Sequence, residues 1–292
     1  MRSQSSVESV ERNLSDRPLS GSSIFSLEDK VAIVTGALGL LGKHHCHALA
    51  EAGANVAIAD LDDKSCKNFA AELEEIYHRE VFGSTIDITM PASITSFRDR
   101  LMEKCGHIDV LVNNAAINDM FENPLAAAEL SRFENYPLDL WQKSIDVNLT
   151  GTFLCSQIIG IVMAQQKAGS IINIASTYGI VGPDQSIYSR HDGTQEFYKS
   201  AAYPTTKGAI LAFTRFLAAY WGKAGIRVNA ISPGGVENGQ SEDFVRNYSH
   251  RTPLGRMADP TDYKGALVFL ASEASRYMTG ANIVVDGGWT AW

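Results

Sequence analysis

Short, continuously apolar runs alternate along the chain with longer stretches in which apolar residues recur at helical spacing. Seven of these runs predict buried strands, at residues 31–35, 55–60, 81–86, 108–113, 170–175, 226–231 and 281–285. Strands separated by helices are joined by crossovers and pair in parallel, and unbroken apolar runs are typical of strands covered on both faces. The sequence therefore predicts an α/β fold with one doubly wound, seven-stranded parallel sheet and helices on both of its faces.

The chain divides into a polar start and one continuous body. Nothing rich in Pro, Gly or Ser interrupts residues 25–292, so we expect a single domain there. Residues 1–24 carry too little apolar surface to offset the entropy of ordering, which predicts a flexible N-terminal tail. This segment lacks the apolar core of a secretory signal, and no apolar run is long enough to predict a membrane span.

Charge and cysteine content narrow the partners and the compartment. The chain carries 25 Lys and Arg against 33 Asp and Glu, and the net charge of −8 disfavours nucleic acid and anionic membranes as partners. Its four cysteines form no CxxC pair, which is typical of free thiols in a reducing compartment. We therefore expect a soluble, cytoplasmic protein that binds neither nucleic acid nor membranes.

A glycine-rich turn separates the first predicted strand from the first predicted helix. Gly36, Gly39 and Gly42 allow a tight turn and a close approach of the backbone to a pyrophosphate, which the helix N-terminus favours. Asp60 ends the second strand, where a carboxylate accepts hydrogen bonds from ribose hydroxyls and repels a 2′-phosphate. These residues predict a site for NAD rather than NADP. A turn without a ligand and a solvated strand-end acid are the alternatives.

Tyr203 and Lys207 are four residues apart in a predicted helix at 200–221, so both side chains lie on one face. An ammonium beside a phenol favours the phenolate and lowers the pKa of the phenol toward working pH. Such a phenol can exchange the proton that accompanies hydride transfer. The pair alone is weak evidence and is also typical of an exposed helix. The pair becomes stronger evidence for an active site because it follows the fifth predicted strand, on the side of the sheet where the pocket is expected.

Three predicted connections, 117–137, 182–202 and 235–252, are longer than crossovers require. They follow the fourth, fifth and sixth strands, and ligands bind beyond the carboxyl ends of such strands, so we expect them to rim one pocket. The last two hold six basic residues, which favour an anionic substrate group such as a sugar phosphate, with solvated loop charges as the alternative. These residues are Arg190, His191, Lys199, Arg246, His250 and Arg251.

Histidines are clustered in the first predicted helix. Only His44 and His47 share a face there, and no third ligand is placed beside them, so we expect surface histidines and no metal site. Near the C-terminus, Trp289 and Trp292 predict either pocket walls or core and subunit-contact positions.

Taken together and in their order, these motifs resemble the short-chain dehydrogenase/reductase family from about Ser26 to the C-terminus. Further shared motifs are Asn-Asn-Ala-Ala at 113–116, Asp-Val-Asn at 146–148, Pro-Gly at 233–234 and Val-Asp-Gly-Gly at 285–288. The resemblance implies a Rossmann-type fold and NAD-dependent hydride transfer between nicotinamide and a secondary alcohol or ketone. It also implies a homo-tetramer or homo-dimer.

The resemblance also implies roles for single residues. Tyr203 would be the catalytic acid/base, and Lys207 would lower its pKa and hold the nicotinamide ribose. Ser176, or else Thr177, would hydrogen-bond the reacting oxygen, and Asn148 would hold a water in a proton relay. The implied cofactor-binding residues are Gly36, Leu38, Gly39, Leu40, Leu41, Gly42, Asp60, Leu61, Asp87, Ile88, Asn113, Asn114, Ala115, Ala116, Tyr203, Lys207, Pro233, Gly234 and Val236.

Ser176 and Tyr203 are farther apart than is usual in the family, because of an insertion at about 182–202. This insertion and the chain ending at 286–292 resemble the flagellin modification protein A-type oxidoreductases of nonulosonic (legionaminic) sugar pathways. Gluconate 5-dehydrogenase-like proteins are a broader neighbour. The narrower resemblance implies carbohydrate metabolism and a sugar-derived substrate. An epimerase or dehydratase that recycles NAD, and a non-catalytic dinucleotide-binding sensor, are the alternative functions.

Overall fold

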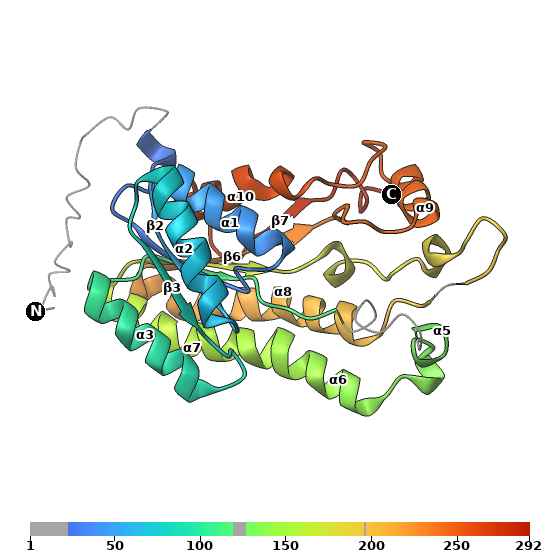
Figure 1. Ribbon diagram of the computed structural model, residues 1–292, viewed down its shortest axis with the longest axis horizontal. Helices are drawn as coiled ribbons and strands as arrows, with labels where there is room; N and C mark the ends of the chain where they lie inside the picture. The colour runs from blue at the N-terminus through green and yellow to red at the C-terminus, as the bar shows by residue number, and fades with distance from the viewer. Residues whose placement is uncertain (1–22, 119–126, 196) are drawn as a thin grey trace, which may run out of the picture.

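The computed structural model describes residues 23–118, 127–195 and 197–292, so nearly all of the predicted tail lies outside the described residues. Seven strands form one parallel sheet in the order β3-β2-β1-β4-β5-β6-β7, which confirms the predicted fold class (Figure 1). The strands are β1 (Val31–Thr35), β2 (Asn55–Asp60), β3 (Val81–Thr85), β4 (Val110–Asn113), β5 (Gly169–Ile174), β6 (Ile226–Pro233) and β7 (Asn282–Val285).

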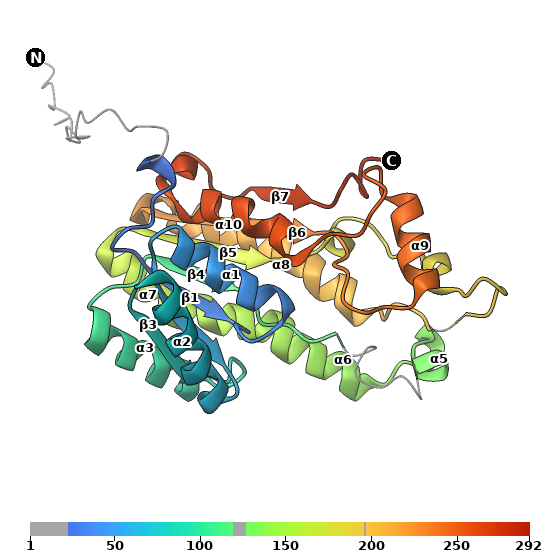
Figure 2. The ribbon, with the colours of Figure 1, turned by 45° about the horizontal axis from the view of Figure 1, so that its top comes forward.

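Helices cover both faces of this sheet (Figure 2). One face carries α1 (Leu40–Glu51), α2 (Asp63–Tyr77) and α10 (Lys264–Ala271). The other carries α3 (Pro91–Cys105), α7 (Thr152–Gln166) and α8 (Ala202–Trp221). Two layers of helix explain the continuous apolar runs, since every residue of β1 is buried.

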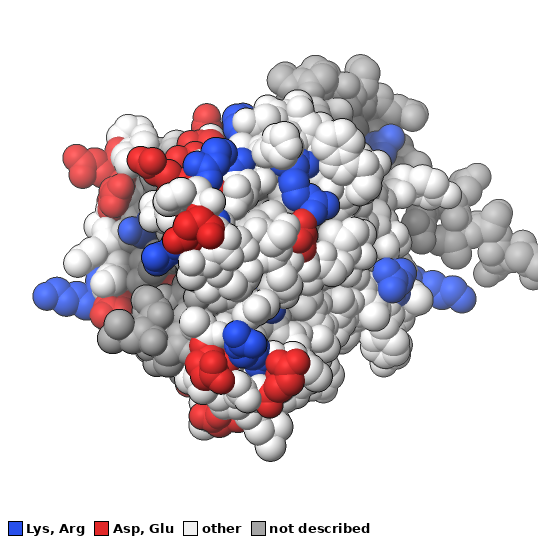
Figure 3. Space-filling model, turned by 90° about the vertical axis from the view of Figure 1, so that its right-hand side faces the viewer, with Lys and Arg blue, Asp and Glu red and all other residues white. Residues whose placement is uncertain are grey.

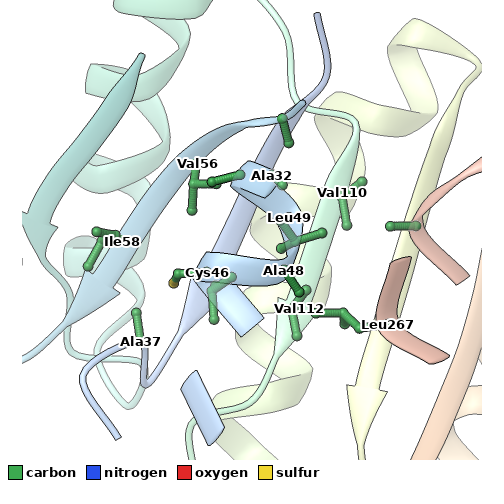
Figure 4. Packing of buried hydrophobic residues seen from close by; sticks show 14 of the residues in the cluster. Ala32, Ala37, Cys46, Ala48, Leu49, Val56, Ile58, Val110, Val112 and Leu267 are labelled. Atoms are coloured by element: carbon green, nitrogen blue, oxygen red, sulfur yellow. The ribbon is translucent and has the colours of Figure 1, made fainter. Parts of the chain in front are cut away.

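The packing of α1 shows how the first layer is held. Cys46, Ala48 and Leu49 face the sheet between Val56 of β2 and Val112 of β4 (Figure 4). All five side chains belong to one buried cluster, and Leu49 is fully buried. Burial of one such leucine contributes about 1.5–3 kcal/mol to stability. The first helix is therefore fixed on the sheet, and its N-terminus points to the carboxyl ends of the strands.

Strands β1 and β4 form the point at which the strand order reverses. From β1 the chain runs outward to β2 and β3, and then returns to β4 on the other side. The two sides are tied together by Asn114, whose side-chain amide donates to the carbonyl oxygens of Thr35 (3.0 Å) and Gly36 (2.9 Å). A ligand-binding crevice is expected at such a reversal.

The predicted connection 235–252 contains a helix, so the expectation of a continuous loop there was wrong. Helix α9 (Glu242–Arg251) begins after Ser241, whose hydroxyl accepts from the backbone N–H of Phe244. Acidic residues in its first turn and basic residues in its last turn complement the helix dipole. In the connection 117–137, the described part contains the short helix α5 (Ala127–Leu130).

Helix α6 (Leu138–Ser144) continues through a π-helical segment, Ile145–Gly151, into α7. In the described part of the chain, this Leu138–Gln166 stretch is the only helix long and apolar enough for a membrane span, and 44% of its most apolar window is buried. Its α7 part packs against α3, β4 and β5. We interpret it as a core helix with one free face.

His45 of α1 is buried, which contradicts the expectation that the histidines of this helix lie on its surface. Neither of its ring nitrogens has a hydrogen-bond partner, and burial lowers its pKa to about 4. His47 is partly buried and its Nδ1 lies 3.1 Å from the Tyr77 hydroxyl. Within the described ranges, no group of three His, Cys, Asp or Glu side chains could hold a metal ion.

Candidate active site

A groove of about 720 Å³ runs over the carboxyl ends of β1 to β4. It contains most of the predicted cofactor-binding residues: Gly36, Leu38, Gly39, Leu40, Leu41, Asp60, Leu61, Asp87, Ile88, Asn114, Ala115 and Ala116. It also contains residues that the sequence did not assign to cofactor binding: Ile86, Thr89, Ile117, Lys143 and Val147. All of these except Lys143 are direct neighbours of a predicted site residue, which was the available signal.

The glycine turn has the shape that a dinucleotide requires. Gly36 has a φ of +62°, and a Cβ there would lie 2.7 Å from the Cα of Ala115. A Cβ at Gly42 would collide with the carbonyl oxygen of Gly36. At Gly39 a Cβ would meet only that carbonyl oxygen and otherwise open space. The turn therefore leaves room for a phosphate at the N-terminus of α1, where unpaired N–H groups favour an anion.

Asp60 lines this groove beside the glycine turn. Its Oδ2 accepts from the N–H of Leu38 (2.9 Å), and its Oδ1 accepts from the N–H of Leu61 (2.7 Å). The carboxylate is thus fixed beside the glycine turn, and its neighbour Leu61 is exposed and uncharged. This geometry places a carboxylate in the groove next to the glycine turn.

Two predicted cofactor-binding residues line neither this groove nor the cavity that adjoins it. Gly42 is buried inside α1, where it allows close packing on the turn. Asn113 is also buried, and its amide donates to Ser156 Oγ (3.0 Å) and to Asn173 Oδ1 (2.8 Å). Gly42 lies in the first turn of α1 and Asn113 is the last residue of β4, and both face the core. They therefore contribute to the packing beneath the groove and not to its surface.

A second cavity, of about 300 Å³, adjoins the groove beyond β5 and β6. Among its lining residues are six further predicted site residues: Ser176, Tyr203, Lys207, Pro233, Gly234 and Val236. All three long connections contribute to it, as predicted, through Asn118, Tyr188, Lys199, Gln240, Phe244 and Tyr248. The aromatic residues of these connections were not predicted individually, because their burial depends on contacts between loops.

The insertion 182–202 is packed into this wall. Its Tyr188 stacks on Phe244 of α9, with ring centroids 5.3 Å apart, and its hydroxyl lies 3.0 Å from that of Tyr178. Burial raises the pKa of Tyr178 to about 12 and raises that of Tyr188 as well. These two tyrosines are neutral at physiological pH. Trp289 is buried against Tyr248 at 4.1 Å, whereas Trp292 is exposed.

Tyr203 lines the cavity together with Ser176 and Thr177. Burial raises the pKa of Tyr203, and the side chain of Ser176 opposes that rise, which favours Ser176 over Thr177 as the hydroxyl partner. The sequence predicted a lowered pKa instead. The difference arises because desolvation of the phenolate outweighs the stabilising contacts around it.

Lys207 is buried on the same face of α8. Its Nζ donates to the carbonyl oxygen of Ile174 (2.7 Å) and lies 5.7 Å from the centroid of the Tyr203 ring. Burial lowers the pKa of Lys207 to about 8. The protonation of Lys207 therefore changes near physiological pH. Its separation from the Tyr203 ring weakens the electrostatic stabilisation that its charge gives the phenolate.

Asn148 lies in the π-helical segment, beneath the cavity. Its Oδ1 accepts from the N–H of Ile117 (2.8 Å), and its Nδ2 donates to the carbonyl of Ile117 (3.1 Å) and to Thr206 Oγ1 (3.3 Å). The side chain thus joins the start of the 117–137 connection to α8, next to Lys207. Its predicted part in a proton relay stays a prediction.

Of the six basic residues of the loops, three lie at ion-pair distance from acidic side chains. Arg251 pairs with Asp184, and Arg246 and His191 both pair with Asp243. Basic and acidic groups accordingly lie in mixed clusters around this end of the molecule (Figure 3). Of the six, Lys199 alone lines the cavity.

A parallel sheet with a glycine turn at its reversal point, and a Tyr–Lys pair in a cavity beyond it, defines the dinucleotide-dependent oxidoreductases of the α/β class. The chain belongs to the short-chain dehydrogenase/reductase family. Residues 36–290 match the family described as enoyl-(acyl carrier protein) reductase.

Characterised relatives cover nearly the whole chain. A 3-alpha-(or 20-beta)-hydroxysteroid dehydrogenase of Mycobacterium tuberculosis is 37% identical over 90% of this chain and 90% of its own length. A D-threitol dehydrogenase of Mycolicibacterium smegmatis is 34% identical over 91% of this chain and 95% of its own. The crystal structure of a gluconate 5-dehydrogenase from Burkholderia cenocepacia, in complex with NADP and tartrate, is 29% identical, with a TM-score of 0.81 over 93% of this chain and 99% of that one.

Proposed function

We propose that the protein is an NAD(H)-dependent dehydrogenase/reductase that interconverts a secondary alcohol and a ketone on a sugar or sugar-phosphate derivative. The observation that carries the proposal is that Tyr203 and Ser176 line one cavity, which adjoins the dinucleotide groove. Relatives named for threitol and gluconate support a polyhydroxylated substrate. A role in flagellin modification through nonulosonic sugars is the narrower form of this proposal.

The chain's own residues supply positioning and proton transfer. Ser176 donates a hydrogen bond to the substrate oxygen, which directs that oxygen toward the Tyr203 hydroxyl. Tyr203 gives its proton to the oxygen during reduction and accepts a proton during oxidation. Lys207, while protonated, stabilises the phenolate form of Tyr203 and offers N–H donors to a ribose. The nicotinamide, when bound, supplies or accepts the hydride.

The experiment that tests this proposal measures NADH formation or loss with polyols, sugars, sugar phosphates and hydroxy acids. With the substrate so found, Tyr203→Phe should lower kcat by about 10²–10⁴-fold, the usual contribution of a general acid/base. Retention of the wild-type rate by this variant would exclude the proposed role. Conversion of a substrate without net NADH change would indicate an epimerase or dehydratase, and cofactor binding without any turnover would indicate a sensor.

We also propose that the protein is a cytoplasmic homo-dimer or homo-tetramer. The free face of α7 and α8 exposes large apolar side chains, among them Phe153, Ile161, Phe216 and Tyr220. Apolar patches on this scale are typical of protein interfaces, and a second copy of the chain would cover them.

A further inference from the structure

Two aromatic side chains from different segments share one wall of the substrate cavity. Tyr178 follows β5, two residues after Ser176, and Phe244 lies in the first turn of α9. Both line the cavity that also contains Ser176 and Tyr203, and both are partly exposed. Together, Tyr178 and Phe244 are called the aromatic platform below.

Tyr188 of the insertion contacts both members of the aromatic platform. Only 3% of Tyr188 is exposed. Its ring stacks on that of Phe244, with centroids 5.3 Å apart and planes 29° apart, and its hydroxyl lies 3.0 Å from that of Tyr178. It also packs against Phe197 of the same insertion, with centroids 4.7 Å apart. One residue of the insertion therefore positions both rings of the platform.

The insertion is itself tied to the segments on either side of the cavity. Asn247 of α9 donates to the carbonyl oxygens of Ile187 (3.3 Å) and Ser189 (3.0 Å). In the 117–137 connection, Ser131 Oγ accepts from the N–H of Tyr198 (2.8 Å). The platform is thus held in place before a substrate arrives, which reduces the entropy lost on binding.

An aromatic ring face binds an apolar surface of matching shape. A saturated six-membered ring with mainly equatorial hydroxyls has axial C–H bonds that form such a surface, and its conformation is already restricted. An open-chain polyol carries a hydroxyl on every carbon and loses several bond rotations on binding. The cavity volume of about 300 Å³ is at the lower end of the range for ligand pockets, which fits a single ring.

We propose that the aromatic platform packs on one face of a saturated ring, and that the substrate is a cyclic secondary alcohol or ketone, such as a pyranose or a cyclitol, rather than an open-chain polyol. The ring lies on Tyr178 and Phe244 with its reacting carbon toward Tyr203. Tyr188 is a positioning residue that acts through the platform. This inference rests on the proposed function and narrows its substrate class.

Two matched pairs of probes test the platform: 1,5-anhydro-D-glucitol with D-glucitol, and cyclohexanol with 3-hexanol. Each pair has one cyclic and one open-chain member with the same number of carbons, and the second pair removes the influence of further hydroxyls. We expect the wild type to show a kcat/KM at least about 10-fold higher for the cyclic member of each pair.

Phe244→Ala should lower kcat/KM for the cyclic probes by about 10-fold, mainly through KM, because it removes one ring face. It should leave kcat/KM for the open-chain probes within about 2-fold, and Phe244→Tyr should retain the preference. Tyr188→Leu should also raise KM for the cyclic probes, whereas Tyr188→Phe keeps the stack and should retain most of the preference. Phe133→Ala is a control at an aromatic residue that is 80% exposed. An unchanged Kd for NADH verifies that each variant is folded.

The possible outcomes separate this inference from the proposed function. Equal kcat/KM values within both pairs, or a preference that Phe244→Ala leaves intact, would overturn the platform while the dehydrogenase activity stands. If no probe is turned over, calorimetric titration of the NADH-bound protein with the same pairs decides. Tighter binding of the cyclic members that Phe244→Ala abolishes supports the platform even then. Equal binding within the pairs, or no binding of the cyclic members, refutes it.

Discussion

The pKa values of Tyr203 and Lys207 are shifted by burial rather than by close ion pairs. Tyr203 has its pKa raised by desolvation, and Lys207 has its pKa lowered to about 8 by the same cause. Each shift disfavours the charged form. The proton-transfer pair therefore depends on Lys207 keeping its proton, and this dependence can be measured.

The rate of carbonyl reduction should fall as the pH rises above about 8. Lys207 loses its proton through this range, because its pKa in the folded protein is about 8. Its neutral form no longer stabilises the developing phenolate of Tyr203. We expect log kcat/KM, measured with saturating NADH, to decline above that pH, and Lys207→Arg to move the decline upward or remove it. An unchanged alkaline limb in Lys207→Arg would assign the decline to another group.

Asp60→Asn should weaken the preference for NAD over NADP. The variant keeps an oxygen that can accept from Leu38 or Leu61, but it removes the charge that repels a 2′-phosphate. We expect the ratio of kcat/KM for NAD to that for NADP to fall by about 10-fold, which corresponds to about 1.4 kcal/mol. Steady-state kinetics with both cofactors measure this ratio. A wild-type protein that prefers NADP would contradict the assignment itself.

At the scale of elements, the strands could be predicted well, because helices cover both sheet faces and each strand is therefore a continuous apolar run. Each predicted strand agrees with the structure to within about two residues at its ends. Helix α9 was missed although Ser241 and its acidic first turn are a start signal, because its apolar residues are few. Lys199 could not be separated from the other basic loop residues, since its side chain is held by a contact with Asn118, which lies 81 residues away in the sequence.

Helix α1 should make the protein sensitive to mild acid through His45. The pKa of this side chain is about 4 in the folded protein and 6.5 in an unfolded chain, so the unfolded state binds more protons between these values. The free energy of unfolding should fall as the pH drops from about 6.5 to 4, by up to about 3 kcal/mol. Urea unfolding at pH 7 and pH 5 measures the change.

His45→Leu should remove this part of the pH dependence, since it replaces the unpartnered imidazole by an apolar group. His250→Gln is a suitable control, because that side chain is exposed in α9. If the difference in stability between the two pH values is the same in His45→Leu and in the wild type, another group is responsible for it.

At the scale of the whole molecule, the free face of α7 and α8 determines how copies can associate. Phe216 is 61% exposed and Tyr220 is 68% exposed, and their rings stack with centroids 5.9 Å apart. Figure 1 shows both helices along one side of the sheet. An apolar pair of this kind is typical of an interface anchor.

Phe216→Glu should shift the protein toward a smaller assembly, because a carboxylate would have to be desolvated within the interface. Light scattering coupled to size-exclusion chromatography gives the mass of the wild type and the variant. Arg215→Glu, on the same helix, is a control for a change of charge alone. A wild-type protein that is monomeric at micromolar concentration would contradict the proposed assembly.

The two cavities share only four of the described residues, Leu40, Leu41, Asn114 and Ala116. The groove is built from residues 36–147, and most of the substrate wall comes from residues 174–257. Within that wall, the segment 182–202 contains none of the residues to which we assign cofactor binding or proton transfer. Natural variation in this segment can therefore alter which compound is oxidised while the cofactor groove is inherited unchanged, and its exchange between homologues is a practical route to new catalysts.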